Sequence, residues 1–144
     1  MKGRLVHITP GGLNQKCEWS TDQEVFDYLN TRFGPFQVDV CALPENAKCS
    51  RFFTPEVDGL DQNWAPGPVW MNPPYGRAIT EWMHKAYTES LSGVRVVCLL
   101  PARTDTGWWH DFAMKGELYL IRRRLKFGGA KQCAPFPSAV SVLG

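Results

Sequence analysis

Long hydrophobic runs are missing from this chain of 144 residues. No stretch approaches the roughly 18 consecutive apolar residues that a membrane-spanning helix needs. The start, Met1-Lys2-Gly3-Arg4, also lacks the apolar segment of a secretory signal peptide. We therefore expect a protein that is neither inserted in a membrane nor secreted, and we place it in the cytoplasm.

Paired cysteines are missing as well. The five cysteines are scattered, with no CxxC pair and no zinc-ligand spacing to His7, His84 or His110. An odd number of cysteines does not fit a complete disulfide framework. We expect free thiols and no metal site. The cysteines concerned are Cys17, Cys41, Cys49, Cys98 and Cys133.

A strong net charge is absent too, because the formal charge is only +2. With 44% hydrophobic residues the chain is not disordered, and its length suits one domain. The basic residues are unevenly spread: residues 117–144 hold five basic side chains and one acidic one. A basic end indicates a polyanionic partner, and a solvated surface explains it equally well.

Hydrophobic periodicity predicts helices that alternate with strands. Apolar residues at helical spacing predict a helix that Ser20 caps and Gly34-Pro35 ends, with Val25, Phe26, Leu29 and Phe33 on one face. They also predict a helix over 79–91 and one that Thr104 or Asp105 caps and that runs to 113. Short apolar runs predict strands at 36–41, 68–71, 94–100, 118–121 and 139–143, with a brief one at 51–53. Such alternation predicts a small Rossmann-like α/β fold with a mostly parallel sheet and flanking helices. We expect a loosely structured segment over 1–17 and one domain over 18–144.

The motif Asn72-Pro73-Pro74-Tyr75 follows directly after an expected strand and precedes a helix. Ligands of open α/β sheets bind at this carboxyl edge. The Asn72 side-chain oxygen and the Pro73 carbonyl are two acceptors that suit an exocyclic amine, whose hydrogens they would hold while its nitrogen is methylated. Proline has a fixed φ and no competing N–H. Tyr75 suits stacking on an extruded base. The alternative is a proline-rich turn with Tyr75 packed on the sheet edge.

The resemblance to a known family is carried by motifs that extend from about Glu18 to the C-terminus. The chain resembles the bacteriophage DNA N6-adenine methyltransferase family, which implies S-adenosylmethionine (SAM) as methyl donor, adenine in double-stranded DNA as acceptor, and a phage- or prophage-encoded protein in the bacterial cytoplasm. No room for a separate target-recognition domain is expected. The motifs are Glu18-Trp19-Ser20-Thr21-Asp22-Gln23, Asp39-Val40-Cys41-Ala42, Glu45-Asn46-Ala47-Lys48-Cys49, Asp58-Gly59-Leu60, Asn72-Pro73-Pro74-Tyr75-Gly76, Leu100-Pro101-Ala102-Arg103-Thr104-Asp105-Thr106, Trp108-Trp109-His110 and Arg124-Leu125-Lys126-Phe127-Gly128-Gly129.

The resemblance also implies where SAM binds. Asp39, at the end of the first expected strand of the domain, would bind polar groups of the donor, with an Asx-type turn as the alternative. Many SAM enzymes place a Gly-x-Gly turn after this strand, whereas here no glycine follows. Helix capping is the alternative role for residues 19–21, and a plain loop is the alternative for Asp58 and Leu60. The expected donor-binding residues are Trp19, Ser20, Thr21, Asp39, Cys41, Ala42, Asp58, Leu60 and Asn72.

Candidate DNA contacts lie near the motif and in the basic segment. Consecutive strand residues face opposite sides, so the three arginines at 122–124 cannot all reach one surface. Trp108 and Trp109 fit core packing better than base stacking. The candidate phosphate contacts are Arg77, Arg103, Arg122, Arg123, Arg124, Lys126 and Lys131, and of these we select Arg77, Arg103, Arg122, Arg124 and Lys126.

Two other functions fit these residues. A methyltransferase of the same kind would accept cytosine N4, RNA adenine or a protein glutamine amide, because each has similar geometry. A non-catalytic DNA-binding module would keep the fold and lose the donor, and the missing Gly-x-Gly turn is the only support for this alternative. The oligomeric state and the DNA recognition sequence do not follow from the sequence.

Overall fold

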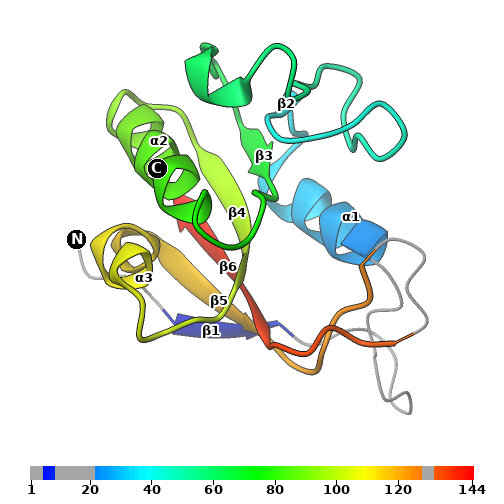
Figure 1. The fold of residues 1–144 in the computed structure, drawn as a ribbon, viewed down its shortest axis with the longest axis vertical. Helices are drawn as coiled ribbons and strands as arrows, with labels where there is room; N and C mark the ends of the chain where they lie inside the picture. Colours follow the sequence, from blue (N-terminus) through cyan, green and yellow to red (C-terminus); the bar gives the residue numbers. More distant parts are fainter. Residues whose placement is uncertain (1–4, 9–21, 128–131) are drawn as a thin grey trace.

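The computed structural model describes residues 22–127 and 132–144, together with the backbone of residues 5–8 (Figure 1). Three α-helices, two short 3₁₀ helices and six strands make up this part of the chain. Along the sequence they are β1 (Leu5–Ile8), α1 (Asp22–Phe33), β2 (Val38–Asp39), η1 (Gly59–Asp61), β3 (Val69–Met71), α2 (Ile79–Leu91), β4 (Val96–Pro101), α3 (Gly107–Asp111), η2 (Ala113–Lys115), β5 (Glu117–Ile121) and β6 (Ser138–Leu143).

The strands form one sheet in the order β1-β5-β6-β4-β3-β2. Strand β6 is antiparallel to both of its neighbours, β4 and β5. The other pairs, β1 with β5, β2 with β3, and β3 with β4, are parallel. Five strands therefore point the same way, which confirms the expected α/β class and mostly parallel sheet. The carboxyl ends of β2, β3 and β4 lie along one edge, where the candidate site is found.

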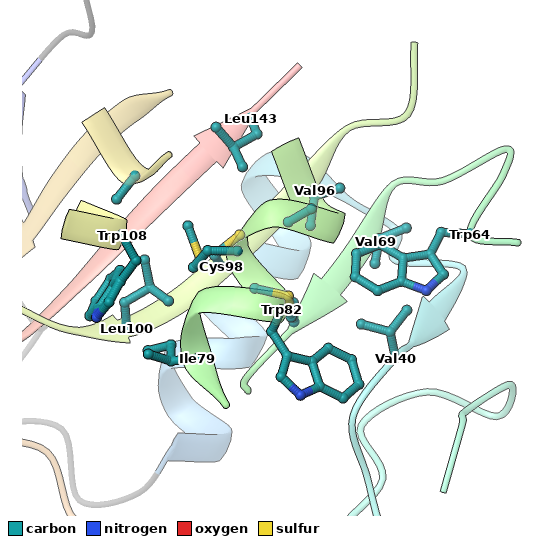
Figure 2. Close-up of a cluster of buried hydrophobic side chains, with 14 of the residues drawn as sticks. Val40, Trp64, Val69, Ile79, Trp82, Val96, Cys98, Leu100, Trp108 and Leu143 are labelled. Atoms are coloured by element: carbon teal, nitrogen blue, oxygen red, sulfur yellow. The ribbon is translucent and has the colours of Figure 1, made fainter. Parts of the chain in front are cut away.

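Helices cover both faces of the sheet, with α2 and α3 on one face and α1 on the other (Figure 1). Alternate residues of β4 serve the two cores: Cys98 points to the side of α2, and Leu99 to the side of α1. Figure 2 shows the α2 side, where Trp108 and Trp82 pack against strand residues. Trp108 and Trp109 are buried, so the expectation of core packing is confirmed.

The second helix shows how local sequence sets an element. Ile79, Trp82, Met83 and Ala86 are buried at helical spacing and face the sheet. The helix ends just before Gly93, whose φ of 93° belongs to the left-handed region that glycine adopts most easily. Helix α1 likewise ends at Phe33, before Gly34-Pro35. Both helices therefore end where the glycines that follow them predict.

Several details differ from the sequence-based expectations. Strand β1 lies within the segment expected to be loose, because it is stabilised by pairing with the distant β5. The third helix, expected from Thr104 or Asp105 to residue 113, spans only Gly107–Asp111, because Phe112 leaves helical geometry and a 3₁₀ turn follows. The strand expected at 51–53 is a single bridge between Asp39 and Phe52. The capping residue Ser20 lies outside the described residues.

The cysteines also differ from expectation. Cys41, Cys49 and Cys98 are free thiols, as expected. Cys133, in contrast, is disulfide-bonded, which corrects the expectation of free thiols throughout.

Within the described part of the chain, no helix has the length and apolar character to cross a membrane.

Candidate active site

A cavity of about 610 Å³ opens at the carboxyl edge of the parallel strands. Residues 72–75, which follow β3 directly, form one side of it. The segments after β2 and around η1 form the rest, together with Trp82 and Phe127. The structure thus brings the predicted motif and four predicted donor-binding residues into one cavity. The lining consists of Cys41, Ala42, Leu43, Asn46, Phe53, Thr54, Pro55, Asp58, Gly59, Leu60, Asn72, Pro73, Pro74, Tyr75, Trp82 and Phe127.

The 72–75 motif has an internal hydrogen bond. The Tyr75 hydroxyl donates to Oδ1 of Asn72 over 3.4 Å. Burial, and to a lesser extent the charge of Asp22, raises the pKa of Tyr75 far above its usual value, so its hydroxyl stays protonated and can donate. Pro73 is buried while Pro74 is exposed. The motif therefore presents a side-chain oxygen and a rigid proline residue at the wall of the cavity.

Asp39 lies beneath the cavity and is not among its lining residues. The residue is 2% exposed, and its carboxylate accepts hydrogen bonds from the backbone N–H groups of Cys41 (3.3 Å) and Lys48 (3.0 Å). Burial outweighs these bonds and the charge of Lys48, and it raises the pKa of Asp39 to about 6. The bond from Cys41 forms the Asx-type turn that the sequence left open, and the bond from Lys48 holds the other end of the 41–48 loop. This loop supplies four lining residues.

The second segment of the cavity, residues 53–60, is held by close packing. A Cβ atom at position 59 would collide with the Val40 carbonyl oxygen, so glycine is required there. The Gly59 carbonyl accepts a hydrogen bond of 2.7 Å from the Trp64 indole. Asp58, with a φ of 54°, accepts from the backbone N–H of Leu60 over 3.0 Å. Asp58 and Leu60 therefore hold fixed positions in the wall.

Aromatic residues that the sequence analysis did not assign to the site contribute to the cavity. Trp82 belongs to the buried face of α2, and its ring stacks on Trp64 with centroids 6.3 Å apart (Figure 2). Phe53 lies in the loop after the bridge to β2. Phe127 lies in a motif that carried the family resemblance without an assigned role. Helical periodicity identifies Trp82 as core, but it does not show that one part of the ring reaches a cavity.

The predicted DNA-contacting residues lie around the same edge. The side chains of Arg77, Arg103, Arg122 and Arg124 are exposed, and Lys126 is half-buried. The Arg103 guanidinium lies 5.6 Å from the centre of the Phe136 ring, which in turn contacts Tyr75. Trp19, Ser20, Thr21 and Lys131 lie outside the described residues. Among the residues with described side chains, no group of three or more His, Cys, Asp or Glu could hold a metal ion.

Comparison with known proteins identifies the family of this chain. A family described as DNA N-6-adenine-methyltransferase (Dam) matches residues 12–138. The DNA N-6-adenine-methyltransferase of Haemophilus phage HP1 is 31% identical over 118 residues, which cover 79% of this chain and 68% of that protein. The protein of the same name from Escherichia phage T1 is 36% identical over 94 residues, 65% of this chain but only 39% of the relative. The resemblance to the phage family is confirmed, and the chain belongs to the DNA N-6-adenine-methyltransferase (Dam) family.

Proposed function

We propose that this chain is an enzyme that transfers a methyl group from SAM to the exocyclic N6 amine of a flipped-out adenine in double-stranded DNA. One observation carries the proposal: the 72–75 motif and the 53–60 segment line the same cavity, at the sheet edge where α/β folds bind ligands. Family membership supports adenine as the acceptor and DNA as the partner.

The residues of the cavity fit SAM. Its volume of about 610 Å³ lies within the range of roughly 300–1,000 Å³ that small-molecule sites occupy. Phe53, Leu60 and Trp82 provide apolar surface for a nucleoside ring, while Asp58 and Asn46 provide polar groups. When bound, SAM supplies an electrophilic methyl group on a sulfonium. The site residues for the donor are then Cys41, Ala42, Asp58, Leu60 and Asn72, with Trp19, Ser20 and Thr21 still expected to contribute.

The cavity is open even though the turn after β2 contains no Gly-x-Gly sequence. Ala42 stands in the turn after β2, is buried, and lines the cavity with a side chain of a single methyl group. Its backbone N–H donates to the Phe53 carbonyl, which fixes the turn against the neighbouring loop. A small residue in a fixed turn lets backbone atoms approach a ligand closely. We therefore assign Asp39 the role of positioning this turn, rather than contacting the donor.

The catalytic contribution of the motif is to hold the amine. An adenine amine is a poor nucleophile because its lone pair is delocalised into the ring. Asn72 Oδ1 and the Pro73 carbonyl would accept its two hydrogens and keep the lone pair on nitrogen, while Pro74 restricts Pro73 to an extended backbone. Tyr75 would stack on the base plane. Positioning supplies the rate enhancement, and the displaced proton passes to water after transfer.

The fold and surface support the same proposal. We assign the mostly parallel sheet, with its one inserted antiparallel strand, to a Rossmann-like SAM-dependent methyltransferase fold that includes strand β1 as well as the expected domain over residues 18–144. The exposed arginines at the site edge suit phosphates of a duplex. The phage origin of its relatives supports a location in the host bacterial cytoplasm.

Methylation of defined DNA tests the proposal. The purified protein is incubated with methyl-labelled SAM and unmethylated plasmid, and the nucleosides are analysed by mass spectrometry. We expect N6-methyladenine. Modified cytosine beside unmodified adenine would overturn the choice of acceptor, and parallel incubations with RNA and protein test the other amines and amides. A thermal shift with SAM tests the non-catalytic alternative, because donor at 100 times its dissociation constant adds about 2.7 kcal/mol of stability.

A further inference from the structure

The turn between β4 and α3 lies close to Tyr75, at the carboxyl edge of the sheet. Its first residue, Ala102, donates a backbone hydrogen bond of 2.9 Å to the carbonyl of Pro137, just before β6. The guanidinium of Arg103 lies 5.6 Å from the centre of the Phe136 ring, and that ring lies 5.3 Å from the Tyr75 ring. One aromatic ring therefore separates the side chain of Arg103 from the proposed catalytic motif.

Hydrogen bonds to backbone carbonyls fix the shape of this turn. The Arg103 carbonyl accepts a bond of 3.2 Å from the Thr106 N–H and one of 2.7 Å from the Thr106 hydroxyl. The Thr104 carbonyl accepts a bond of 2.7 Å from Nε2 of His110, which lies on α3. The side chains of Arg103, Thr104 and Asp105 are exposed. A turn that is fixed before binding loses little entropy when these side chains contact a partner.

Within the described part of the chain, the Asp105 carboxylate has no hydrogen bond or ion pair. Thr106, rather than Asp105, occupies the N-cap position of α3, so helix capping does not account for this carboxylate. Exposed arginines lie along the same edge of the site, among them Arg77, Arg103 and Arg124. Phosphates attract these arginines and repel a carboxylate. Asp105 therefore suits a part of the DNA other than its backbone.

The chemistry of the bases identifies a contact that suits a carboxylate. An ionised carboxylate only accepts hydrogen bonds, and cytosine presents its N4 amine as a donor in the major groove. Adenine also presents an amine there, but its N7 acceptor lies beside that amine and repels a carboxylate. Guanine and thymine present oxygen acceptors in the same groove. Cytosine is therefore the base that an exposed aspartate selects.

We infer that Asp105 is a specificity-determining residue that accepts a hydrogen bond from the N4 amine of a cytosine near the target adenine. This inference rests on the proposed function. Phosphate contacts fix the register of a protein on DNA, and base contacts specify the sequence, so Arg103 and Asp105 have different roles on one turn. Asp105 does not line the cavity, so it acts on the choice of DNA sequence and not on the methyl donor.

Methylation of a pool of duplexes with randomised bases around an adenine tests the inference. Wild type and Asp105→Ala methylate the pool to low conversion, and sequencing that detects N6-methyladenine gives the bases that flank each product. We expect wild type to favour cytosine about tenfold at one flanking position, which is the discrimination that one good base contact supplies. In Asp105→Ala this preference should fall below about threefold, because no acceptor remains for the N4 amine.

Asp111→Ala is the matched control. Asp111 is an exposed residue at the last position of α3, and its replacement removes the same charge outside the turn. We expect this variant to keep the preference of wild type. Single-turnover rates on two duplexes that differ only at the preferred base pair then give the ratio for each protein.

Three results would overturn the inference: no preference for cytosine in wild type, an unchanged preference in Asp105→Ala, or an equal loss of preference in Asp111→Ala. An unchanged preference with faster methylation of every sequence by Asp105→Ala would show that the carboxylate only repels DNA. Absence of methylation by wild type would instead reject the proposed function. The two failures are therefore distinguishable.

Discussion

The hydroxyl of Tyr75 donates to Oδ1 of Asn72 over 3.4 Å, and this oxygen is the acceptor that the proposed chemistry assigns to the adenine amine. The phenolic hydrogen and the amine hydrogen therefore compete for the same lone pairs. The bond is long for an O–H donor, so it is weak and easily exchanged. The Tyr75 hydroxyl thus orients the Asn72 side-chain oxygen, while the Tyr75 ring lines the cavity.

This relationship predicts different effects for two Tyr75 variants. Tyr75→Phe keeps the ring and removes the competing hydrogen bond, so we expect a methylation rate within about fivefold of wild type, since a neutral hydrogen bond contributes only about 1 kcal/mol. Tyr75→Ala removes the stacking surface and should cost about 1–3 kcal/mol in productive base capture. Single-turnover rates at saturating SAM measure both. A larger loss in Tyr75→Phe than in Tyr75→Ala would contradict the stacking role.

A partly buried ion pair joins the cavity loop to the first helix. Lys48 Nζ lies 3.4 Å from Asp22 Oδ2 and donates to Gln23 over 2.8 Å. We expect Lys48→Met to lower the free energy of unfolding by about 1 kcal/mol and to weaken SAM binding several-fold, because the 41–48 loop loses its tie to α1. Chemical unfolding and calorimetric titration measure the two effects.

The matched control for this variant is Lys85→Met, which breaks the ion pair between Lys85 and Glu89 on α2. Lys85 does not line the cavity. We expect unchanged SAM affinity in Lys85→Met. Equal losses of SAM affinity in the two variants would show that the ion pair between Lys48 and Asp22 has no specific role in SAM binding.

The raised pKa of Asp39 predicts that the stability of the protein depends on pH. Burial raises this pKa from 3.8 to about 6 in the folded protein, so between these values the folded state binds more protons than the unfolded state. Stability therefore falls as pH rises through this window, by up to about 3 kcal/mol from this group. Asparagine stays neutral, so the free energy of unfolding of Asp39→Asn minus that of wild type should increase between pH 4 and 7. Urea unfolding measures the difference, and a constant or decreasing value would refute the assignment.

The exposed arginines predict the salt dependence of DNA binding. If Arg103 and Arg124 each contact a phosphate, replacing either with glutamine should reduce the slope of log K against log salt by about 0.9. Arg95→Gln is the control, because Arg95 precedes β4 at the opposite end of that strand and bonds to the carbonyl of Gly144. Fluorescence anisotropy over a salt series gives the slopes. Equal slopes for all four proteins would place the phosphate contacts elsewhere.

Local patterns predicted the elements whose causes are local. The helix over Ile79–Leu91 has its buried residues at helical spacing, and the strand Val96–Pro101 is a continuous apolar run, so both were predicted. Strand Leu5–Ile8 was not, because only its pairing with residues more than 100 positions away defines it. The end of the third helix at Asp111 was also missed. The helical spacing of apolar side chains continues through Phe112, whereas the backbone leaves helical geometry at that residue.

The site was predicted in the same uneven way. The 72–75 motif was identified because its residue types and its place after a strand both indicate chemistry. Asp39 was placed correctly at a strand end, but the sequence could not show that two backbone N–H groups would occupy its carboxylate. Phe127 had no periodic or chemical signal, since only the return of the chain from β5 to β6 brings it to Tyr75.

The side-chain amide of Asn72 is the group on which the account depends most. Methyl transfer and SAM binding should be measured on the same preparations of wild type and Asn72→Ala, by single-turnover methylation of unmethylated DNA and by calorimetric titration. We predict that Asn72→Ala abolishes transfer while SAM affinity changes by less than about fivefold, the effect of one neutral hydrogen bond. Retention of wild-type transfer by Asn72→Ala would contradict the account.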